Sequence, residues 1–157
     1  MPGFEQAEYN GVLDGEGGTS PSPNIQMQLG EYKFSVSTAA YQVLERIREY
    51  RWPKQERLGG MPARQFVGRG DDTISLHGVI FPFSNQRSGS RGSGLYQVGS
   101  MATLAGRGEP LELVDSTGLA WGRWCIERIV ETKRELAGGG IPKKIEFTIS
   151  LGFYAEE

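Results

Sequence analysis

The segment Ile145–Phe153 alternates strictly between apolar and polar side chains along its whole length. Its apolar members are Ile145, Phe147, Ile149, Leu151 and Phe153, and the polar side chains between them include Glu146, Thr148 and Ser150. A period of two places alternate side chains on opposite faces of an extended strand. The chain must therefore fold into a sheet that buries one face of this strand.

Two further segments predict a partner for this strand. Leu111–Val114 and Leu119–Val130 flank Asp115–Gly118, a spacing typical of a hairpin whose Gly adopts a positive φ. We expect Leu119–Val130 to pair with Ile145–Tyr154 through the Gly-rich loop Leu136–Pro142. The C-terminal third of the chain thus reads as an antiparallel meander.

The middle of the chain carries one strong strand signal and two weaker ones. Thr73–Phe81 places Ile74, Leu76 and Ile80 on one face, which favours a strand. Ile25–Ser37 and Gln65–Val67 are shorter strand candidates, and Gly68–Asp72 is a turn by its composition.

Two segments show helical spacing. Thr38–Tyr50 places Ala40, Leu44 and Ile47 on one face and ends before Pro53, so it is predicted to be the clearest helix. Gly94–Ala105 is predicted as a second, weaker helix. The fold class expected is α+β, a mainly antiparallel β-sheet or sandwich with two helices.

The 157 residues divide into an arm and one domain. Residues 1–24 are rich in Gly, Ser, Pro and Glu with few apolar side chains, so we expect a flexible N-terminal arm. Residues 25–157 form the single domain, interrupted by a Gly/Ser-rich loop at residues 84–93. We expect both polar segments to become ordered by contact with neighbouring subunits.

Charge and composition exclude several classes of partner. The net charge is −2 without a run of like charges, which gives no bulk electrostatic case for nucleic acid or an anionic membrane. No segment approaches the ~20 apolar residues that span a bilayer. The single cysteine, Cys125, excludes an intrachain disulfide.

The sequence carries few residues suited to catalysis. His77 is the only histidine, and with Cys125 it cannot form a structural zinc site within one chain. We interpret His77 as a packed or hydrogen-bonded structural residue, and the pair Asp71 and Asp72 as turn residues. We therefore expect no enzymatic role, cofactor or metal.

Aromatic and charged residues at loops and strand ends are candidates for subunit contacts. Trp52 and Pro53 follow the predicted helix and form either a core plug or a rigid anchor on a neighbour. Trp121 lies near the hairpin end, where it suits an interface, whereas Trp124 alternates with Ile126 and suits the core. Arg87 and Arg91 in the Gly/Ser-rich loop contact a neighbouring subunit or phosphate, or remain solvated.

The order and spacing of several motifs resemble the GpU family of tail proteins from contractile-tailed phages. The motifs are Tyr50–Pro53, Gln65–Gly68, Ile74–Pro82, Leu113–Asp115 and Pro142–Leu151. The resemblance covers roughly Leu29–Tyr154, whereas the N-terminal arm and the Gly/Ser-rich loop do not match it.

This resemblance implies a structural virion protein with a tail-tube-like fold, made in the host cytoplasm and needed for tail assembly. It implies a ring at the baseplate-proximal end of the tube, with six copies in keeping with six-fold tail tubes. Its partners would be further copies of itself, the tail tube protein, and hub or adaptor proteins of the baseplate. DNA would pass through the channel without specific binding, past a neutral to acidic lumen for which Glu127, Glu131 and Glu146 are candidate channel or rim residues.

Three other readings compete with this one. A tail terminator or completion protein would occupy the head-proximal end of the same tube. A small monomeric enzyme such as a hydrolase is disfavoured because the sequence offers no coherent nucleophile–base pair. A nucleic-acid-binding module is disfavoured by the net charge and the scattered basic residues.

Overall fold

The computed structural model describes residues 25–35, 39–83 and 93–155. Its elements, in chain order, are β1 (Ile25–Leu29), β2 (Tyr32–Ser35), β3 (Tyr41–Arg51), β4 (Lys54–Gln55), β5 (Ala63–Arg64), β6 (Gly68–Ile80), a 3-10 turn (Ser93–Tyr96), α1 (Gln97–Gly106), β7 (Leu111–Asp115), β8 (Ala120–Leu136) and β9 (Pro142–Ala155). Seven strands form one sheet in the order β2-β1-β7-β8-β9-β6-β3, and β4 pairs with β5. All of these pairings are antiparallel, as predicted.

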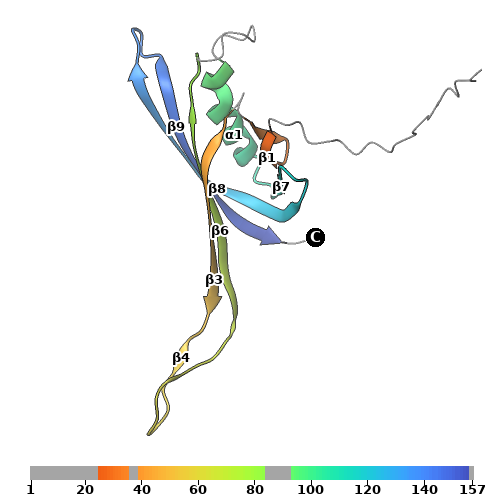
Figure 1. Ribbon diagram of the computed structural model, residues 1–157, viewed down its shortest axis with the longest axis vertical. Coiled ribbons are helices and arrows are strands. Elements are labelled where there is room, and N and C mark those ends of the chain that lie inside the picture. The colour runs from red at the N-terminus through yellow and green to blue at the C-terminus, as the bar shows by residue number, and fades with distance from the viewer. Residues whose placement is uncertain (1–24, 36–38, 84–92, 156–157) are drawn as a thin grey trace, which may run out of the picture.

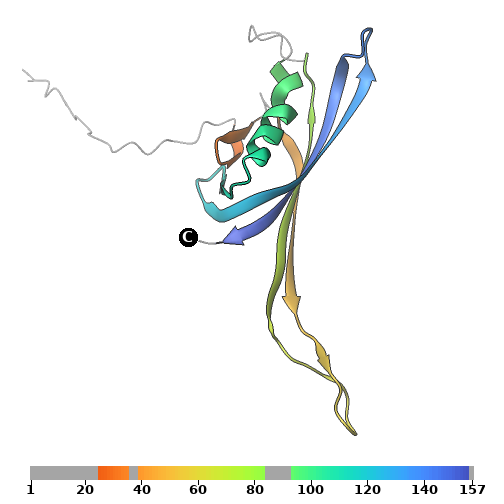
Figure 2. The same cartoon turned by 180° about the vertical axis from the view of Figure 1, so that it is seen from behind.

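The core follows the two alternating segments found in the sequence. Ile145, Phe147, Ile149 and Leu151 of β9 are buried, beside Ile74, Leu76 and Ile80 of β6. The helix α1 lies on the same side of the molecule as β1 and β7 (Figures 1 and 2) and contributes Val98, Met101 and Leu104 to the buried set. Trp124 is fully buried, which confirms its assignment to the core.

The hairpin predicted around Asp115–Gly118 is present between β7 and β8. The Asp115 N–H donates to the Leu119 carbonyl at 3.0 Å, and the Gly118 N–H donates to the Asp115 carbonyl at 3.1 Å. Gly118 has a φ of +85°, a conformation that a Gly adopts without steric cost. The pairing of β8 with β9 through a tight Gly-rich turn is likewise confirmed.

The first predicted helix is wrong, because most of Thr38–Tyr50 belongs to the strand β3. β3 pairs with β6 from Tyr41–Gly78 to Arg51–Gly68, with irregularities near both ends. The helical spacing of apolar side chains extends from Ala40 to Ile47, only about two turns. Val43 and Ile47 are β-branched residues that favour extended backbone. The long pairing with β6 therefore outweighs the local helical pattern. The second predicted helix is confirmed as α1, so one α-helix is found in the described part of the chain.

Two smaller predictions also need correction. Gly68–Asp72 is the beginning of the strand β6 rather than a turn. The short strand expected at Gln65–Val67 lies two residues earlier, as β5. In both cases the Gly and polar residues predicted an interruption of the strand. The antiparallel pairing of the β3–β6 hairpin nevertheless continues through these residues.

Two hairpins give the molecule its extended shape. The β3–β6 hairpin, prolonged by β4 and β5, runs away from the body in one direction (Figure 1). The end of the β8–β9 hairpin projects on the opposite side of the body, as both views show (Figures 1 and 2). The N-terminal arm at residues 1–24 and most of the Gly/Ser-rich loop lie outside the described residues.

Candidate assembly surfaces

We call the distal part of the β3–β6 hairpin, residues 51–69, the arm, and residues 1–24 the N-terminal segment. The two segments of the arm remain paired beyond the main sheet. The Val67 N–H donates to the Arg51 carbonyl at 3.0 Å, and the Gln65 N–H donates to the Pro53 carbonyl at 3.2 Å. Neither view shows another described element beside the outer part of the arm (Figures 1 and 2). A two-stranded ribbon alone is marginally stable in water, so a partner that covers it would stabilise it.

Large apolar side chains of the arm are exposed. Trp52 and Phe66 are each about half exposed and contact each other across the ribbon with ring centroids 5.0 Å apart. Leu58 and Met61 near the tip are 109% and 90% exposed, respectively. Trp52, next to Pro53, is therefore not a core plug, and its ring belongs to an exposed apolar surface of the kind that marks interaction sites.

The arm is also basic. It contains Arg51, Lys54, Arg57, Arg64 and Arg69 against the single acid Glu56, a net charge of +4. The whole chain has 17 basic and 19 acidic residues, so the remaining residues carry 12 basic and 18 acidic groups, a net charge of −6. The overall charge of −2 therefore conceals a strong separation of charge between the arm and the rest of the chain.

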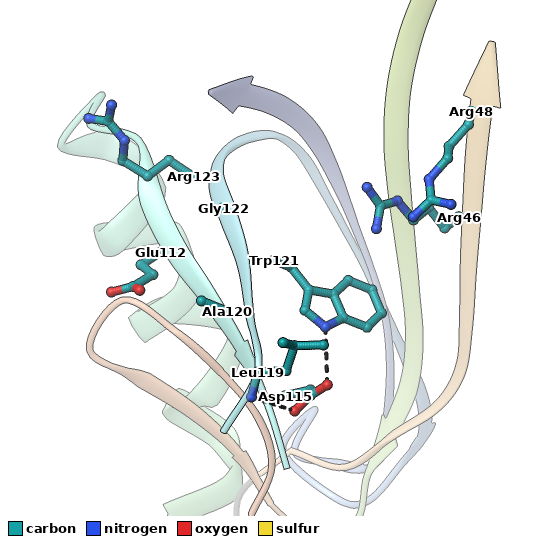
Figure 3. Close-up of a pocket in the computed structure, with 9 residues that line it drawn as sticks. All are labelled: Arg46, Arg48, Glu112, Asp115, Leu119, Ala120, Trp121, Gly122 and Arg123. Atoms are coloured by element: carbon teal, nitrogen blue, oxygen red, sulfur yellow. Dashed lines mark hydrogen bonds between the residues drawn. The ribbon is translucent and has the colours of Figure 1, made fainter. Parts of the chain in front are cut away.

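A cleft of about 810 Å³ lies where the arm joins the body (Figure 3). In Figure 3, Arg46 and Arg48 of β3 face Trp121 of β8, while Arg123 points away on the other side of that strand. Trp121 donates its indole N–H to Asp115 Oδ2 at 3.1 Å. The ring that the sequence identified as an interface candidate is thus held in a fixed orientation at the wall of a cleft.

Asp115 organises the hairpin end of this cleft. Its Oδ1 accepts hydrogen bonds from the Thr117 hydroxyl, the Thr117 N–H and the Leu119 N–H. The hydrogen bond from the Thr117 hydroxyl, together with those from Trp121 and the two backbone groups, holds the pKa of the Asp115 carboxyl below its usual value of 3.8. The carboxylate is therefore a structural acceptor that fixes the turn and Trp121 together.

Arg46 connects the base of the arm to the body. It donates from Nε and Nη2 to the two carboxylate oxygens of Asp72, with a Nε–Oδ1 distance of 2.9 Å. The same guanidinium lies 5.4 Å from the centroid of the Trp121 ring and 5.1 Å from that of Trp124. Composition had predicted a turn at Asp72, and the helix predicted over Thr38–Tyr50 gave Arg46 no partner, whereas pairing of β3 with β6 brings the two side chains together.

The three candidate acids for a channel or rim do not share one face. The pairing register changes between Ile126 and Arg128, so that Glu131 lies opposite Phe147, on the side of the sheet that carries the core. Glu127 instead lies on the outer side of the sheet, where it occupies the space over Gly152. Gly152 pairs with Thr73, which faces the same outer side. Two residues four positions apart on a regular strand face the same way, so the bulge between Ile126 and Arg128 is the physical cause that puts Glu127 and Glu131 on opposite sides of the sheet.

Glu146 is the most strongly paired of these acids. It accepts a hydrogen bond from Arg134 Nε at 2.8 Å and lies 3.3 Å from Lys144 Nζ. The Arg134 hydrogen bond, followed by that of Lys144, lowers the pKa of the Glu146 carboxyl. Glu146 alternates with buried Ile145 and Phe147, so it lies on the same outer side of the sheet as Glu127.

Other sequence candidates occupy structural positions or are not described. His77 Nδ1 lies 2.9 Å from Thr148 Oγ1 on the neighbouring strand, which agrees with a hydrogen-bonded structural histidine. Among the described residues, no group of three or more His, Cys, Asp or Glu side chains is arranged to hold a metal ion. Arg87 and Arg91 lie outside the described residues.

No described helix has the length and apolar character needed to cross a membrane.

Among the described strands, the sheet ends at β2 on one side and at β3 on the other, since β2 is paired with β1 and β3 with β6. Free strand edges are templates for pairing with another chain. Together with the arm, they give this molecule several surfaces suited to contact with further subunits.

The fold matches a solved structure from a phage. The SPP1 Dit (gp 19.1) protein, described as a paradigm of the hub adsorption apparatus in phages that infect Gram-positive hosts, aligns with a TM-score of 0.54 at 10% identity. The alignment covers 82% of this chain and 49% of Dit, so this chain spans about half the length of that protein. A chain from the virion of a native gene transfer agent particle aligns over 90% of this chain and 100% of its own at 14% identity, with a TM-score of 0.45 from which nothing further follows.

The fold thus defines a small antiparallel β protein of a type found in a phage hub component. The sequence identifies it further, because residues 30–156 match the model of the Phage P2 GpU family. The chain belongs to this family of phage tail-associated proteins, and it is a structural protein of a phage tail. A comparison with curated protein sequences found no match.

Proposed function

We propose that the chain forms a ring at the baseplate-proximal end of a contractile tail tube and is required there for tail assembly. The observation that carries this proposal is the arm, which extends an apolar and basic ribbon away from the body with no described element to cover it. A subunit that contributes such a ribbon to its neighbour buries the exposed Trp52–Phe66 pair and gains stability from it. Six copies would match the symmetry of the tube on which the ring is stacked.

Each proposed contact has a place in this arrangement. The edge strands β2 and β3 would extend the sheet into adjacent copies, and Trp121 at the cleft would receive side chains of a neighbour. The tail tube protein and a baseplate hub or adaptor protein would bind the two sides of the ring. The protein would have no enzymatic activity and would act in the virion after synthesis in the host cytoplasm.

The channel would be lined by the outer side of the sheet that carries Glu127 and Glu146. Thr73, Ser75, Thr148 and Ser150 alternate with buried residues and lie on this side between the two acids. Arg128, Arg134 and Lys144 lie on the same side, and the last two are paired with Glu146. This pairing reduces the positive charge open to phosphate, and the hydroxyl and carboxylate groups let DNA pass, because the phosphate backbone binds chiefly to Lys and Arg. Glu131, on the opposite side of the sheet, would lie at a rim or a subunit contact instead.

A tail terminator at the head-proximal end is the second candidate within the same class. Its subunit would also need edge strands and an arm, so the position in the tail distinguishes the two proposed functions. Cryo-electron microscopy of intact tails tests both. Density for this chain beside the baseplate supports the proposed ring, and density only at the head-proximal end replaces it with the terminator.

A further inference from the structure

We infer that the arm binds the acidic N-terminal segment, residues 1–24, of a second copy of this chain. The inference deepens the proposed function, because it names the partner surface that the arm would contact within a ring or between rings. It begins from the position of the basic side chains of the arm. Arg51, Arg57, Arg64 and Arg69 are all exposed, and no described acid pairs with them among the ion pairs of the structure.

The N-terminal segment has the complementary charge. Residues 1–24 contain Glu5, Glu8, Asp14 and Glu16 and no Lys or Arg, which gives four negative side chains against the net +4 of the arm. The segment also carries apolar side chains, namely Phe4, Tyr9, Val12 and Leu13. Each of these apolar side chains or pairs adjoins an acid, as in Phe4–Glu5, Glu8–Tyr9 and Val12–Asp14. This pattern suits a ribbon whose basic side chains are interspersed with exposed Trp52, Phe66, Leu58 and Met61.

The place where the segment joins the body favours a second copy over the same chain. Residue 24 precedes β1, and Gln26 is hydrogen-bonded to Tyr41 at the beginning of β3. The arm begins at the other end of β3, about 35 Å away at ~3.3 Å per residue of strand, and extends farther from the body. To reach the arm of its own chain, the N-terminal segment would have to run along the length of β3 before it could bind. The N-terminal segment of a neighbouring copy stacked on the arm would lie beside the arm without that detour.

Nucleic acid is the other class of ligand that basic and aromatic side chains can bind. The acidic segment is the better occupant, since it belongs to the same chain and is therefore present in equal number to the arm in every assembly. A segment that covers the arm would also remove a basic surface that otherwise retards DNA.

Site-specific cross-linking tests the inference on the full chain, with Cys125→Ser in every variant. One preparation carries Gly11→Cys in the segment, and a second carries Gly60→Cys at the arm tip, where an added side chain meets open space. A third carries Gly138→Cys in the β8–β9 turn, which is equally open and serves as the matched control. After mixing, a bismaleimide reagent should join position 11 to position 60 several-fold more than to position 138.

Two further variants separate the outcomes. Neutralising the segment with Glu5→Gln, Glu8→Gln, Asp14→Asn and Glu16→Gln should abolish the preference for position 60, as should raised salt. Equal cross-linking to positions 60 and 138, or a preference unaffected by neutralisation, would overturn the inference. A chain with both Gly11→Cys and Gly60→Cys that cross-links only within itself would exclude the second copy.

An oligonucleotide that binds the arm while no preferential cross-link forms would assign the arm to nucleic acid instead. The ring's position in the tail is measured separately by microscopy. A ring at the baseplate-proximal end without this cross-link refutes the inference alone, whereas the cross-link with the chain at the other end refutes only the proposed function.

Discussion

Arg46 of β3 and Asp72 of β6 form a two-point ion pair at the base of the arm, and the same Arg46 guanidinium lies beside the rings of Trp121 and Trp124. Both side chains are about one-fifth exposed, at 22% and 21%. The pair thereby connects the β3–β6 hairpin to the β7–β8 hairpin, two parts of the sheet that come from distant regions of the sequence.

Replacing Asp72 by Ala should lower the free energy of unfolding by about 1–3 kcal/mol, because it leaves the partly buried guanidinium without its carboxylate. Arg48→Met is the matched control, since Arg48 lies 3.9 Å from the same carboxylate and is mostly exposed. Urea unfolding followed by tryptophan fluorescence measures both. A larger loss in Arg48→Met than in Asp72→Ala would show that Arg46 does not anchor the arm.

Trp52→Ala should weaken subunit association more than it weakens the fold, because the ring is half exposed and packs only on Phe66 among the aromatic contacts of the described residues. Mass photometry across a concentration series measures association, and thermal unfolding measures the fold. Trp124→Ala serves as the contrast. Trp124 is fully buried, so its truncation should cost about 3–5 kcal/mol of stability. Unchanged association in Trp52→Ala would remove Trp52 from the interface.

Acid should destabilise the hairpin end of the cleft through Asp115. The folded pKa of this carboxyl is lowered, chiefly by the Thr117 hydroxyl, so its stabilising contribution is fully present above the usual value of 3.8 and is lost as the pH falls through the folded value. Asp115→Asn should therefore be less stable than the native chain at neutral pH, and the difference should shrink with acidification. A difference that is constant across pH would contradict this account.

Gly78 allows β6 to lie close to its neighbours, because a Cβ at this position would collide with the Ala40 carbonyl and the ring of Phe147. Gly78→Ala should lower stability by about 1–3 kcal/mol through overpacking. Gly138→Ala is the control, since a Cβ there meets nothing within 4 Å. Equal melting temperatures for the two variants would show that the β6 contact relaxes without cost.

Elements whose conformation is specified by neighbouring residues could be predicted from the sequence, and elements that depend on distant strands could not. The strand β9 and the β7–β8 hairpin were predictable, because strict alternation and a turn with Gly118 specify them within a few residues. β3 was not, since its extended conformation depends on pairing with β6, whose residues lie between 17 (Arg51–Gly68) and 37 (Tyr41–Gly78) positions farther along the chain. Reading β3 as a helix then concealed the arm, and with it the role of Arg46.

Part of the candidate site was nevertheless within reach of the sequence. Trp52 and Trp121 were identified as interface candidates, and the structure places them on the arm and in the cleft at its base. The charge of residues 51–69 could have been found by summing charge over short windows instead of over the whole chain. The bulge that separates Glu127 from Glu131 has no comparable signal, because neither residue differs in type from an ordinary strand acid.

The most direct test of the proposed ring is a cryo-electron microscopy map of the assembled tail at side-chain resolution. We expect six copies of this chain around a channel at the baseplate-proximal end of the tube, with each arm in contact with another copy. Glu127 and Glu146 should face the channel. A monomer or dimer of this chain in the tail, a position at the head-proximal end, or a channel lined mainly by Lys and Arg would contradict the account.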